Sequence, residues 1–155
     1  MGDKLKQRLK QSKFSSPSQE ALLNLFVSTY VVRGRYDTLF MKFGITNPQY
    51  NVLRILKGVY PEGYPRCEII SRMIEPAPDV TRLVDKLIKE KYAERSHSSE
   101  DKRQSITKIT RKGLKLLDEI LPEIQALDLV VTKNFSETEL NELSKLCEKL
   151  YGDNN

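Results

Sequence analysis

Apolar residues recur at three- and four-residue steps along much of the chain, a spacing that places them on one face of a helix. The first run follows Ser16-Pro17-Ser18-Gln19, where a capping serine, a proline at the first helical position and a glutamine mark a helix start. We predict a long helix over about 17–43, closed by Gly44 in the left-handed conformation. Thr46-Asn47-Pro48-Gln49 repeats the capping signature and predicts a second helix to about Gly58. Its expected inward face is Tyr50, Leu53, Ile55, Leu56 and Val59.

Two shorter amphipathic patterns follow a proline-rich loop at 60–65, which has room for a scrap of edge strand. The first begins at Arg66 and is expected to bury Cys67, Ile70, Met73 and Ile74. Glu75-Pro76-Ala77-Pro78 forces a turn, with Pro78 in the first turn of the next helix. The buried face of that helix is expected to be Val80, Leu83, Val84, Leu87 and Ile88. Its polar face is expected to be Asp79, Thr81, Arg82, Asp85, Lys86 and Lys89. Two short helices joined by a tight turn, the second with an exposed polar face, indicate a helix-turn-helix.

The pattern changes after Lys91, where segments 92–96 and 104–109 are typical of two strands around a polar turn at 97–103. A basic hairpin placed directly after the second short helix would be a wing. Thr110 can cap a further long helix, whose apolar side is expected to be Leu114, Leu117, Leu121, Ile124 and Leu127. A capping box at 136–139 predicts a last helix. It presents Leu140, Leu143, Leu146, Cys147 and Leu150.

Together these elements predict a mainly α fold with a small β-hairpin wing (α+β), a winged helix-turn-helix flanked by long helices. A chain of 155 residues is the size of one domain. We expect a flexible basic arm at 1–15, with a weak helical turn at Lys4–Lys10, and a single domain at 16–155. The winged helix-turn-helix core is expected over about 46–110.

Charge is distributed unevenly along the chain, whose formal net charge is +5. Residues 66–112 carry twelve Lys and Arg against eight Asp and Glu, whereas residues 113–155 carry four against nine. This segregation suits a central region that faces a polyanion. A merely solvated charged surface would explain the density of charge but not its segregation.

Several classes of function are disfavoured by the residues present. There is no glycine-rich phosphate loop, no nucleophile with a plausible base and a single His97, so we expect no enzyme, no cofactor and no metal site. The longest uncharged run, 21–32, is too short to span a membrane, and the N-terminus lacks an apolar export segment. A cytoplasmic protein is expected. Cys67 and Cys147 are expected to be free and mostly buried rather than a redox switch.

Four segments, in this order, resemble the multiple-antibiotic-resistance-regulator (MarR) family of winged-helix transcription factors. They are Ile45-Thr46-Asn47-Pro48-Gln49-Tyr50, Val80-Thr81-Arg82-Leu83-Val84-Asp85-Lys86-Leu87, Glu100-Asp101-Lys102-Arg103 and Ile109-Thr110-Arg111-Lys112-Gly113. The resemblance implies a homodimer, joined through helices at about 17–43 and 111–151, that binds pseudo-palindromic duplex DNA. It also implies relief of repression by a small-molecule effector.

The resemblance and the exposed basic positions together define candidate site residues. Arg82 and Thr81 match the groove-facing part of the recognition helix, and Asp101 and Arg103 match the wing pattern that enters the minor groove. Pro76 and Asp79 depart from the family, Pro76 at the usual polar N-cap. The predicted DNA-binding set is Ala77, Pro78, Asp79, Thr81, Arg82, Lys86, Asp101, Lys102, Arg103, Arg66 and Arg72. A set that is expected to bind phosphates without reading sequence is Arg66, Arg72, Arg95, Lys102 and Lys108. The predicted dimer contacts are Leu22, Phe26, Leu117, Leu121, Leu143 and Leu150, and an effector pocket would involve Tyr30, Arg33, Tyr36 and Tyr50.

The sequence therefore favours a transcriptional regulator that is a homodimeric repressor of a pseudo-palindromic operator. Its expected partners are double-stranded DNA, a second copy of itself and a small effector, with no membrane. The alternative is a winged-helix module that binds another protein and does not read DNA sequence, because winged helices serve several roles.

Overall fold

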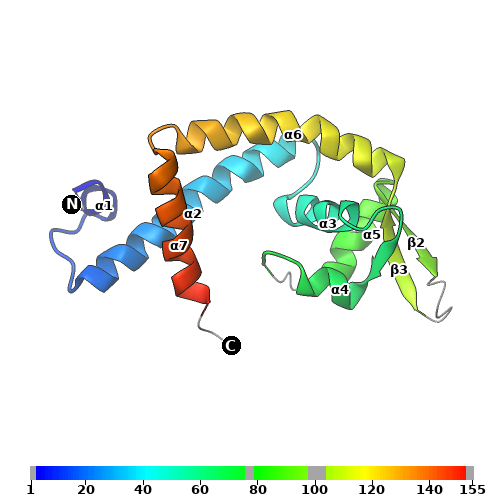
Figure 1. Cartoon of the computed structure of the whole chain (residues 1–155), viewed down its shortest axis with the longest axis horizontal. Helices are drawn as coiled ribbons and strands as arrows, with labels where there is room; N and C mark the ends of the chain where they lie inside the picture. Colours follow the sequence, from blue (N-terminus) through cyan, green and yellow to red (C-terminus); the bar gives the residue numbers. More distant parts are fainter. Residues whose placement is uncertain (1–2, 76–78, 98–103, 153–155) are drawn as a thin grey trace.

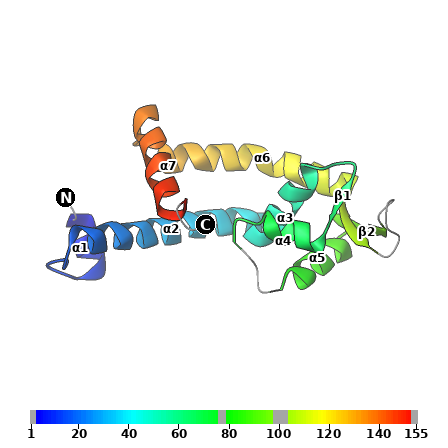
Figure 2. The same cartoon turned by 60° about the horizontal axis from the view of Figure 1, so that its bottom comes forward.

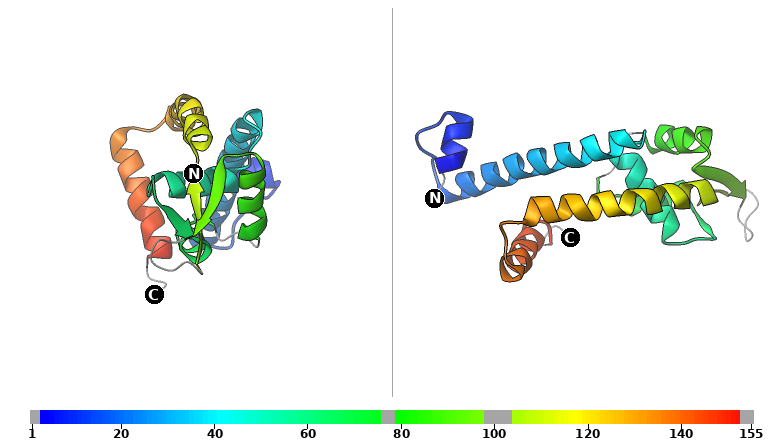
Figure 3. Two further views of the ribbon diagram at one scale, coloured as in Figure 1. Left: turned by 90° about the vertical axis from the view of Figure 1, so that its right-hand side faces the viewer. Right: turned by 90° about the horizontal axis from the view of Figure 1, so that it is seen from above.

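The computed structural model describes residues 3–75, 79–97 and 104–152, and it has two parts (Figure 1). One part is a compact group of short elements: α3 (Asn47–Lys57), β1 (Gly63–Pro65), α4 (Arg66–Ser71), α5 (Val80–Lys89), β2 (Ala93–His97) and β3 (Ser105–Ile109). The other is a helical arm formed by α1 (Asp3–Leu9), α2 (Pro17–Lys42), α6 (Arg111–Thr132) and α7 (Glu137–Tyr151). The C-terminal half of α2 lies beside α6, and the N-terminal half of α2 diverges from it (Figures 1 and 3). The predicted fold class, mainly α with a small antiparallel sheet, is confirmed.

Side-chain caps set where the helices begin. Four of the helices have a side-chain cap from a hydroxyl, as the sequence predicts. In each, the hydroxyl accepts a hydrogen bond from the backbone amide three residues later, at Ser16, Thr46, Thr110 and Ser136. Gly44 has a φ of 71°, the left-handed conformation that closes α2. These bonds satisfy amides that the first turn of each helix leaves unpaired.

The sheet has three antiparallel strands in the order β1-β3-β2. Strand β1 pairs with β3 through Tyr64 opposite Thr107, so the last part of the 60–65 loop forms an edge strand of the sheet, as expected. Strands β2 and β3 form the predicted hairpin, with Ala93 opposite Ile109 and His97 opposite Ser105. Figure 2 shows this hairpin extending from the compact part, at the end opposite α1.

The core lies where α3 packs against the C-terminal end of α2, the first half of α6, α4 and α5. Its largest fully buried side chains are Phe40, Val52, Leu53, Leu56, Ile69, Leu87 and Ile120. In α3 the prediction named Ile55, which is only half-buried, and missed Val52. In α6 it missed Leu116 and Ile120 and included Leu121, which is exposed.

The predicted buried face of α4 is wrong except at Met73, which is half-buried against the core. Ile69 is its fully buried residue, whereas Cys67 and Ile70 are exposed and Ile74 retains 84% of its accessible surface. Apolar residues occur on both sides of this short segment, so two stripes fit the helical spacing equally well. The helix also ends at Ser71, which leaves Ile74 outside any helical stripe. Cys147 is half-buried, so neither thiol is fully buried, contrary to expectation.

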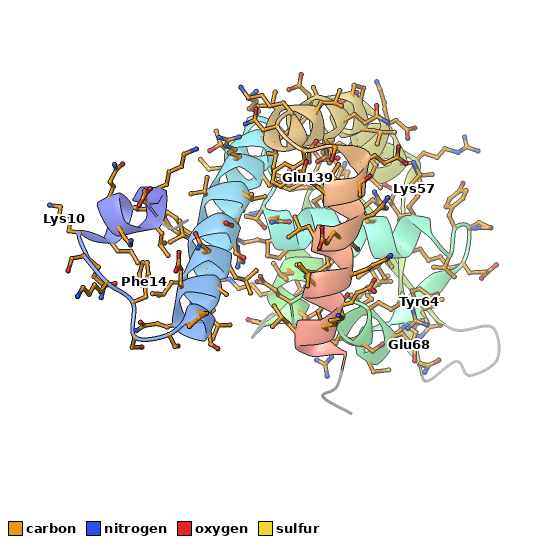
Figure 4. All side chains as sticks on the ribbon, turned by 60° about the vertical axis from the view of Figure 1, so that its left-hand side comes forward. Lys10, Phe14, Lys57, Tyr64, Glu68 and Glu139 are labelled. Carbon is orange, nitrogen blue, oxygen red and sulfur yellow. The ribbon has the colours of Figure 1, made fainter. Side chains whose placement is uncertain are left out.

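The N-terminal segment contains more structure than predicted. Residues 3–9 form α1, longer than a single helical turn, and Leu5 retains only 3% of its accessible surface. Figure 4 shows Phe14 in the connection that leads from α1 to α2. The segment predicted as a flexible arm with a weak helical turn thus contains a helix with one buried leucine.

The helical arm exposes much apolar surface. Helix α7 buries none of its residues, although its capping box is formed. The large apolar side chains exposed on α2, α6 and α7 include Leu22, Phe26, Tyr30, Leu121, Leu129, Val130, Leu143, Leu146, Leu150 and Tyr151. Leu117, by contrast, retains only 3% of its accessible surface and belongs to the core, so its predicted place in a dimer contact is wrong. Within the described residues, no helix is long and apolar enough to cross a membrane.

Candidate nucleic-acid interface

Helix α5 is fixed in the compact part by an apolar face and by its own cap. Val80, Val84 and Leu87 are buried against the core. The Oδ1 atom of Asp79 accepts a hydrogen bond of 2.9 Å from the amide of Arg82, so Asp79 is the N-cap. A carboxylate at this position satisfies a free amide and complements the positive end of the helix dipole. The helix therefore begins at Val80. Its polar N-cap is Asp79, three residues after Pro76, where the family resemblance placed it.

The exposed surface of α5 has two distinct flanks. The outer flank carries Arg82, Lys86 and Lys89, all exposed. Among the described residues, none accepts a hydrogen bond or ion pair from the side chain of Arg82 or Lys86. Two cations one helical turn apart are thus left available to a ligand.

The inner flank of α5 faces the sheet and is occupied by internal contacts. Thr81 Oγ1 accepts a hydrogen bond of 2.9 Å from Nη1 of Arg66, and Asp85 Oδ1 pairs with Nη2 of Arg95 at 2.6 Å. Between them lies a hollow of about 380 Å³, which we call the α5–sheet hollow. It is lined by Arg66, Thr81, Val84, Arg95, Ser105 and Thr107.

Other predicted phosphate-binding cations also have partners within the protein. Arg72 pairs with Glu68, and its guanidinium lies 4.4 Å from the centre of the Tyr64 ring. The hydrogen bond to Glu68 raises the pKa of Arg72 above its usual value. Figure 4 marks Tyr64 and Glu68 in this part of the molecule. Lys108 pairs with Glu62 at 3.7 Å.

Several predicted contacts fall outside the described residues. These are Ala77 and Pro78 before the recognition helix, with Pro76, and the wing residues Asp101, Lys102 and Arg103. Their roles stay predictions from the sequence.

The end of α5 is tied to the beginning of α6. Thr110 Oγ1 accepts in its cap and donates to the Lys91 carbonyl at 2.7 Å, and the Thr110 amide donates to the Tyr92 carbonyl at 3.0 Å. Lys112 Nζ donates to the Glu90 carbonyl at 2.8 Å and lies 4.5 Å from the centre of the Tyr92 ring. A side chain at Gly113 would place its Cβ 2.3 Å from the Tyr92 carbonyl oxygen. We call these contacts the α5–α6 junction.

Of the residues named for an effector pocket, Tyr36 and Tyr50 both lie against the Phe40 ring, with ring centres 6.2 Å and 4.4 Å from it, whereas Tyr30 and Arg33 have other surroundings. Tyr30 is exposed on α2. Arg33 pairs with Glu75 at 2.8 Å beside a hollow of about 70 Å³, and Tyr50 lines a different hollow of about 250 Å³ between α3 and α6. Tyr36 donates to Asp128 across the α2–α6 contact. Burial, and then the hydrogen bond to Asp128, raise the pKa of Tyr36 to about 12.

Sequence reasoning found the outer flank of α5 but missed the pairing of its inner flank. Arg66 lies 15 positions from Thr81, and Arg95 lies ten from Asp85. No local pattern encodes such contacts, because they depend on how α4 and the hairpin pack against α5. The sequence offered one signal for this pairing: Thr81 and Asp85 are polar and one helical turn apart, so they lie on the same side of α5.

Comparison with known proteins places this geometry in a family. No family model matches the chain. The crystal structure of a MarR transcription factor from Planctomyces limnophilus is 32% identical, with a TM-score of 0.68, and the match covers 88% of this chain and 98% of that one. The chain belongs to the MarR family. The resemblance inferred from its four segments is thereby confirmed, and it is a DNA-binding transcription regulator of the MarR type.

Three further proteins are similar to the chain, one in sequence and two in fold. A curated relative, the HTH-type transcriptional repressor YetL of Bacillus subtilis, is 24% identical over 134 residues, covering 86% of this chain and 80% of YetL. The MepR–DNA complex of S. aureus is 21% identical with a TM-score of 0.74, covering 90% and 98% of the two chains. BpsR of Bordetella bronchiseptica, whose DNA binding is regulated by 6-hydroxynicotinic acid, is 16% identical with a TM-score of 0.79, covering 92% and 100%.

Proposed function

We propose that this MarR-type regulator is a homodimeric repressor that binds a pseudo-palindromic operator with α5 in the major groove. The observation that carries the proposal is the outer flank of α5, where Arg82 and Lys86 are exposed on a helix that buried Val80, Val84 and Leu87 hold rigidly. An arginine on such a helix can donate two hydrogen bonds to a guanine edge. A lysine beside it would contact phosphate. Repression is supported by the description of YetL as a repressor.

The dimer is supported by apolar surface that one copy of the chain leaves exposed. Leu143 and Leu150 of α7 retain 47% and 56% of their accessible surface, and Leu22 and Phe26 of α2 retain 44% and 64%. Large apolar side chains left exposed in this way are typical of a surface that associates. A second copy would cover them and would give two α5 helices related by two-fold symmetry, which a pseudo-palindrome requires.

The wing and an effector complete the proposed regulator. Arg103, with Asp101 orienting it, would enter the minor groove beside the α5 site, and Lys102, Ala77 and Pro78 would contact the backbone nearby. Relief by a small effector is supported by BpsR, whose DNA binding responds to 6-hydroxynicotinic acid. The chain is proposed not to be an enzyme, because the relatives that it matches are transcription regulators.

The test begins with duplexes selected from a random pool by the purified protein. Half-sites one helical turn apart, about 34–36 Å, are expected if two α5 helices bind together. Arg82→Ala should then lose about 1–3 kcal/mol of binding free energy and relax discrimination at one base position. Arg54→Ala, which removes an exposed arginine of α3, is the charge-matched control and should keep the base preference.

Two outcomes would count against the proposal. If Arg82→Ala bound the selected duplex as tightly and as selectively as the unmodified protein, Arg82 would not read a base. If the protein bound no duplex at low salt but co-purified with a stable protein partner, the alternative would hold. In that alternative the same flank of α5 docks a protein.

A further inference from the structure

The α5–sheet hollow lies beside the inner flank of α5, and the side chains that line it carry hydrogen-bond donors and positive charge. Arg66 reaches it from α4 and Arg95 from β2, while Thr81, Ser105 and Thr107 contribute hydroxyls. Asp85 neutralises one of the two guanidinium charges, so the three charged groups leave a net charge of +1. The hollow is therefore suited to one anionic group rather than to an uncharged base edge.

The two arginines are held in place before any ligand arrives. Thr81 and Asp85, one turn apart on the inner flank of α5, hold Nη1 of Arg66 at 2.9 Å and Nη2 of Arg95 at 2.6 Å. A guanidinium has five N–H donors, so each arginine keeps free donors for a second acceptor. A side chain that is already ordered loses less entropy when it binds.

The identity of the anion follows from where the hollow lies, and this step rests on the proposed function. With α5 in the major groove and the hairpin directed to the adjacent minor groove, one sugar–phosphate strand separates the two grooves. That strand has to pass between α5 and the hairpin. The α5–sheet hollow lies between α5 on one side and β2 and β3 on the other, and its volume of about 380 Å³ has room for a phosphodiester group.

We propose that the α5–sheet hollow binds one backbone phosphodiester in each half-site, with Arg66 and Arg95 as its ligands and Thr81 and Asp85 as positioning residues. Thr81 and Asp85 then contact no base, although both lie on the polar face of the recognition helix. The two flanks of α5 have separate tasks: the outer flank reads sequence, and the inner flank fixes the register of the helix on the backbone.

Single-phosphate neutralisation tests the assignment directly. A series of the selected duplex, each with one methylphosphonate in place of a phosphate, is titrated with the unmodified protein by fluorescence anisotropy. One position per half-site is expected to weaken binding about 5- to 20-fold, because a charge-assisted hydrogen bond is lost there. With Arg66→Ala the natural duplex should bind more weakly, equally for all sequences, and the methylphosphonate at that position should have a smaller effect. With Arg66→Ala and Arg95→Ala together that effect should vanish, because both ligands of the phosphate are then removed. The salt slope should fall by about 1.

Matched variants separate positioning from folding. Thr81→Val removes the oxygen that holds Arg66 and should reduce the methylphosphonate effect, whereas Thr81→Ser keeps the hydroxyl and should restore it. Arg66→Lys keeps the charge without the planar fork and should recover part of the affinity. Arg54→Ala should leave the methylphosphonate profile unchanged.

The outcomes distinguish this assignment from the proposed function. If the unmodified protein binds a selected duplex but the double variant Arg66→Ala with Arg95→Ala still loses affinity at the same methylphosphonate, the hollow does not hold that phosphate and the assignment fails alone. A change of base preference in Thr81→Val would likewise overturn it. If the unmodified protein binds no duplex, the proposed function fails and the assignment fails with it.

Discussion

The compact part of the molecule and its helical arm differ in how they use apolar residues. In the compact part Leu53, Leu56 and Ile69 are fully buried, in a core that is completed by Phe40 of α2 and Ile120 of α6. In the arm, α7 buries none of its residues, and Phe26 and Leu129 retain 64% and 71% of their accessible surface. Amphipathic helices thus have two different roles in this molecule. One set stabilises a single chain, and the other presents a surface that a single chain leaves uncovered.

The largest expected effect tests the arm as an association surface. The double variant Leu143→Glu with Leu150→Glu places charge on the apolar side of α7. Two leucines that become buried between copies contribute about 1.5–3 kcal/mol each, so the dimer dissociation constant should rise about 100-fold or more. Sedimentation velocity measures this rise, and circular dichroism should show an unchanged helix content. Lys145→Glu, on the polar side of the same helix, is the control, and equal dissociation in both variants would contradict the assigned face.

The next effect contrasts a core leucine with an arm leucine in the dissociated double variant. Leu56→Ala should lower the free energy of unfolding by about 2–5 kcal/mol, because it leaves a cavity at a fully buried position. Leu146→Ala should change it by less than about 0.5 kcal/mol, since that side chain is half exposed. Urea unfolding compares the two. Equal losses would mean that the arm packs as tightly as the compact part.

Two glycines, Gly113 at the start of α6 and Gly34 in the middle of α2, differ in how closely other atoms surround them. Gly113→Ala should destabilise the protein by about 1–3 kcal/mol, because the new Cβ would lie 2.3 Å from the Tyr92 carbonyl oxygen. Gly34→Ala, in the middle of α2 with open space around it, should instead stabilise by about 0.5–1 kcal/mol. Thermal unfolding of both variants should therefore move in opposite directions. A neutral Gly113→Ala would show that α6 does not approach Tyr92 so closely.

The smallest effect concerns the contact of Tyr36 with Asp128, which joins α2 to α6. The pKa of Tyr36 is raised from 10.0 to about 12 in the folded protein, so the folded state holds this proton more tightly than the unfolded state. The resulting stability is complete below pH 10 and is lost as the pH rises toward about 12. Urea unfolding at pH 9 and 11.5 should show this loss in the unmodified protein. Tyr36→Phe should lack it, and Asp128→Asn should reduce it; an unchanged loss in Tyr36→Phe would assign the effect to another group.

Features encoded within a few residues could be predicted from the sequence. The caps at Ser16, Thr46 and Ser136 depend on a side chain and an amide three positions apart, and the structure forms all of them. The amphipathic pattern of α5 was also sufficient, because one stripe of it is clearly apolar. These signals fixed the order of the elements and the resemblance to the MarR family.

Features that depend on packing between distant elements could not be predicted in this way. In α4, Cys67 and Ile69 are both plausible core residues by spacing, and only the position of α3 and the sheet decides for Ile69. Leu117 lies on the same stripe as Leu121, yet the neighbouring helices cover the first and leave the second exposed. The partners of Arg66 and Arg95 likewise depend on the relative placement of α4, α5 and β2.

The α5–α6 junction joins the end of α5 to the start of the long helix α6. Hydrogen bonds from Thr110 and Lys112 to the backbone at 90–92 prevent α5 and the start of α6 from turning independently. The 22 residues of α6 extend about 33 Å from the α5–α6 junction. A shift of about 3 Å at the far end, where α7 begins, therefore corresponds to a turn of about 5° at α5. If α6 moves as a rigid rod, a small displacement of the arm thus changes the angle of α5.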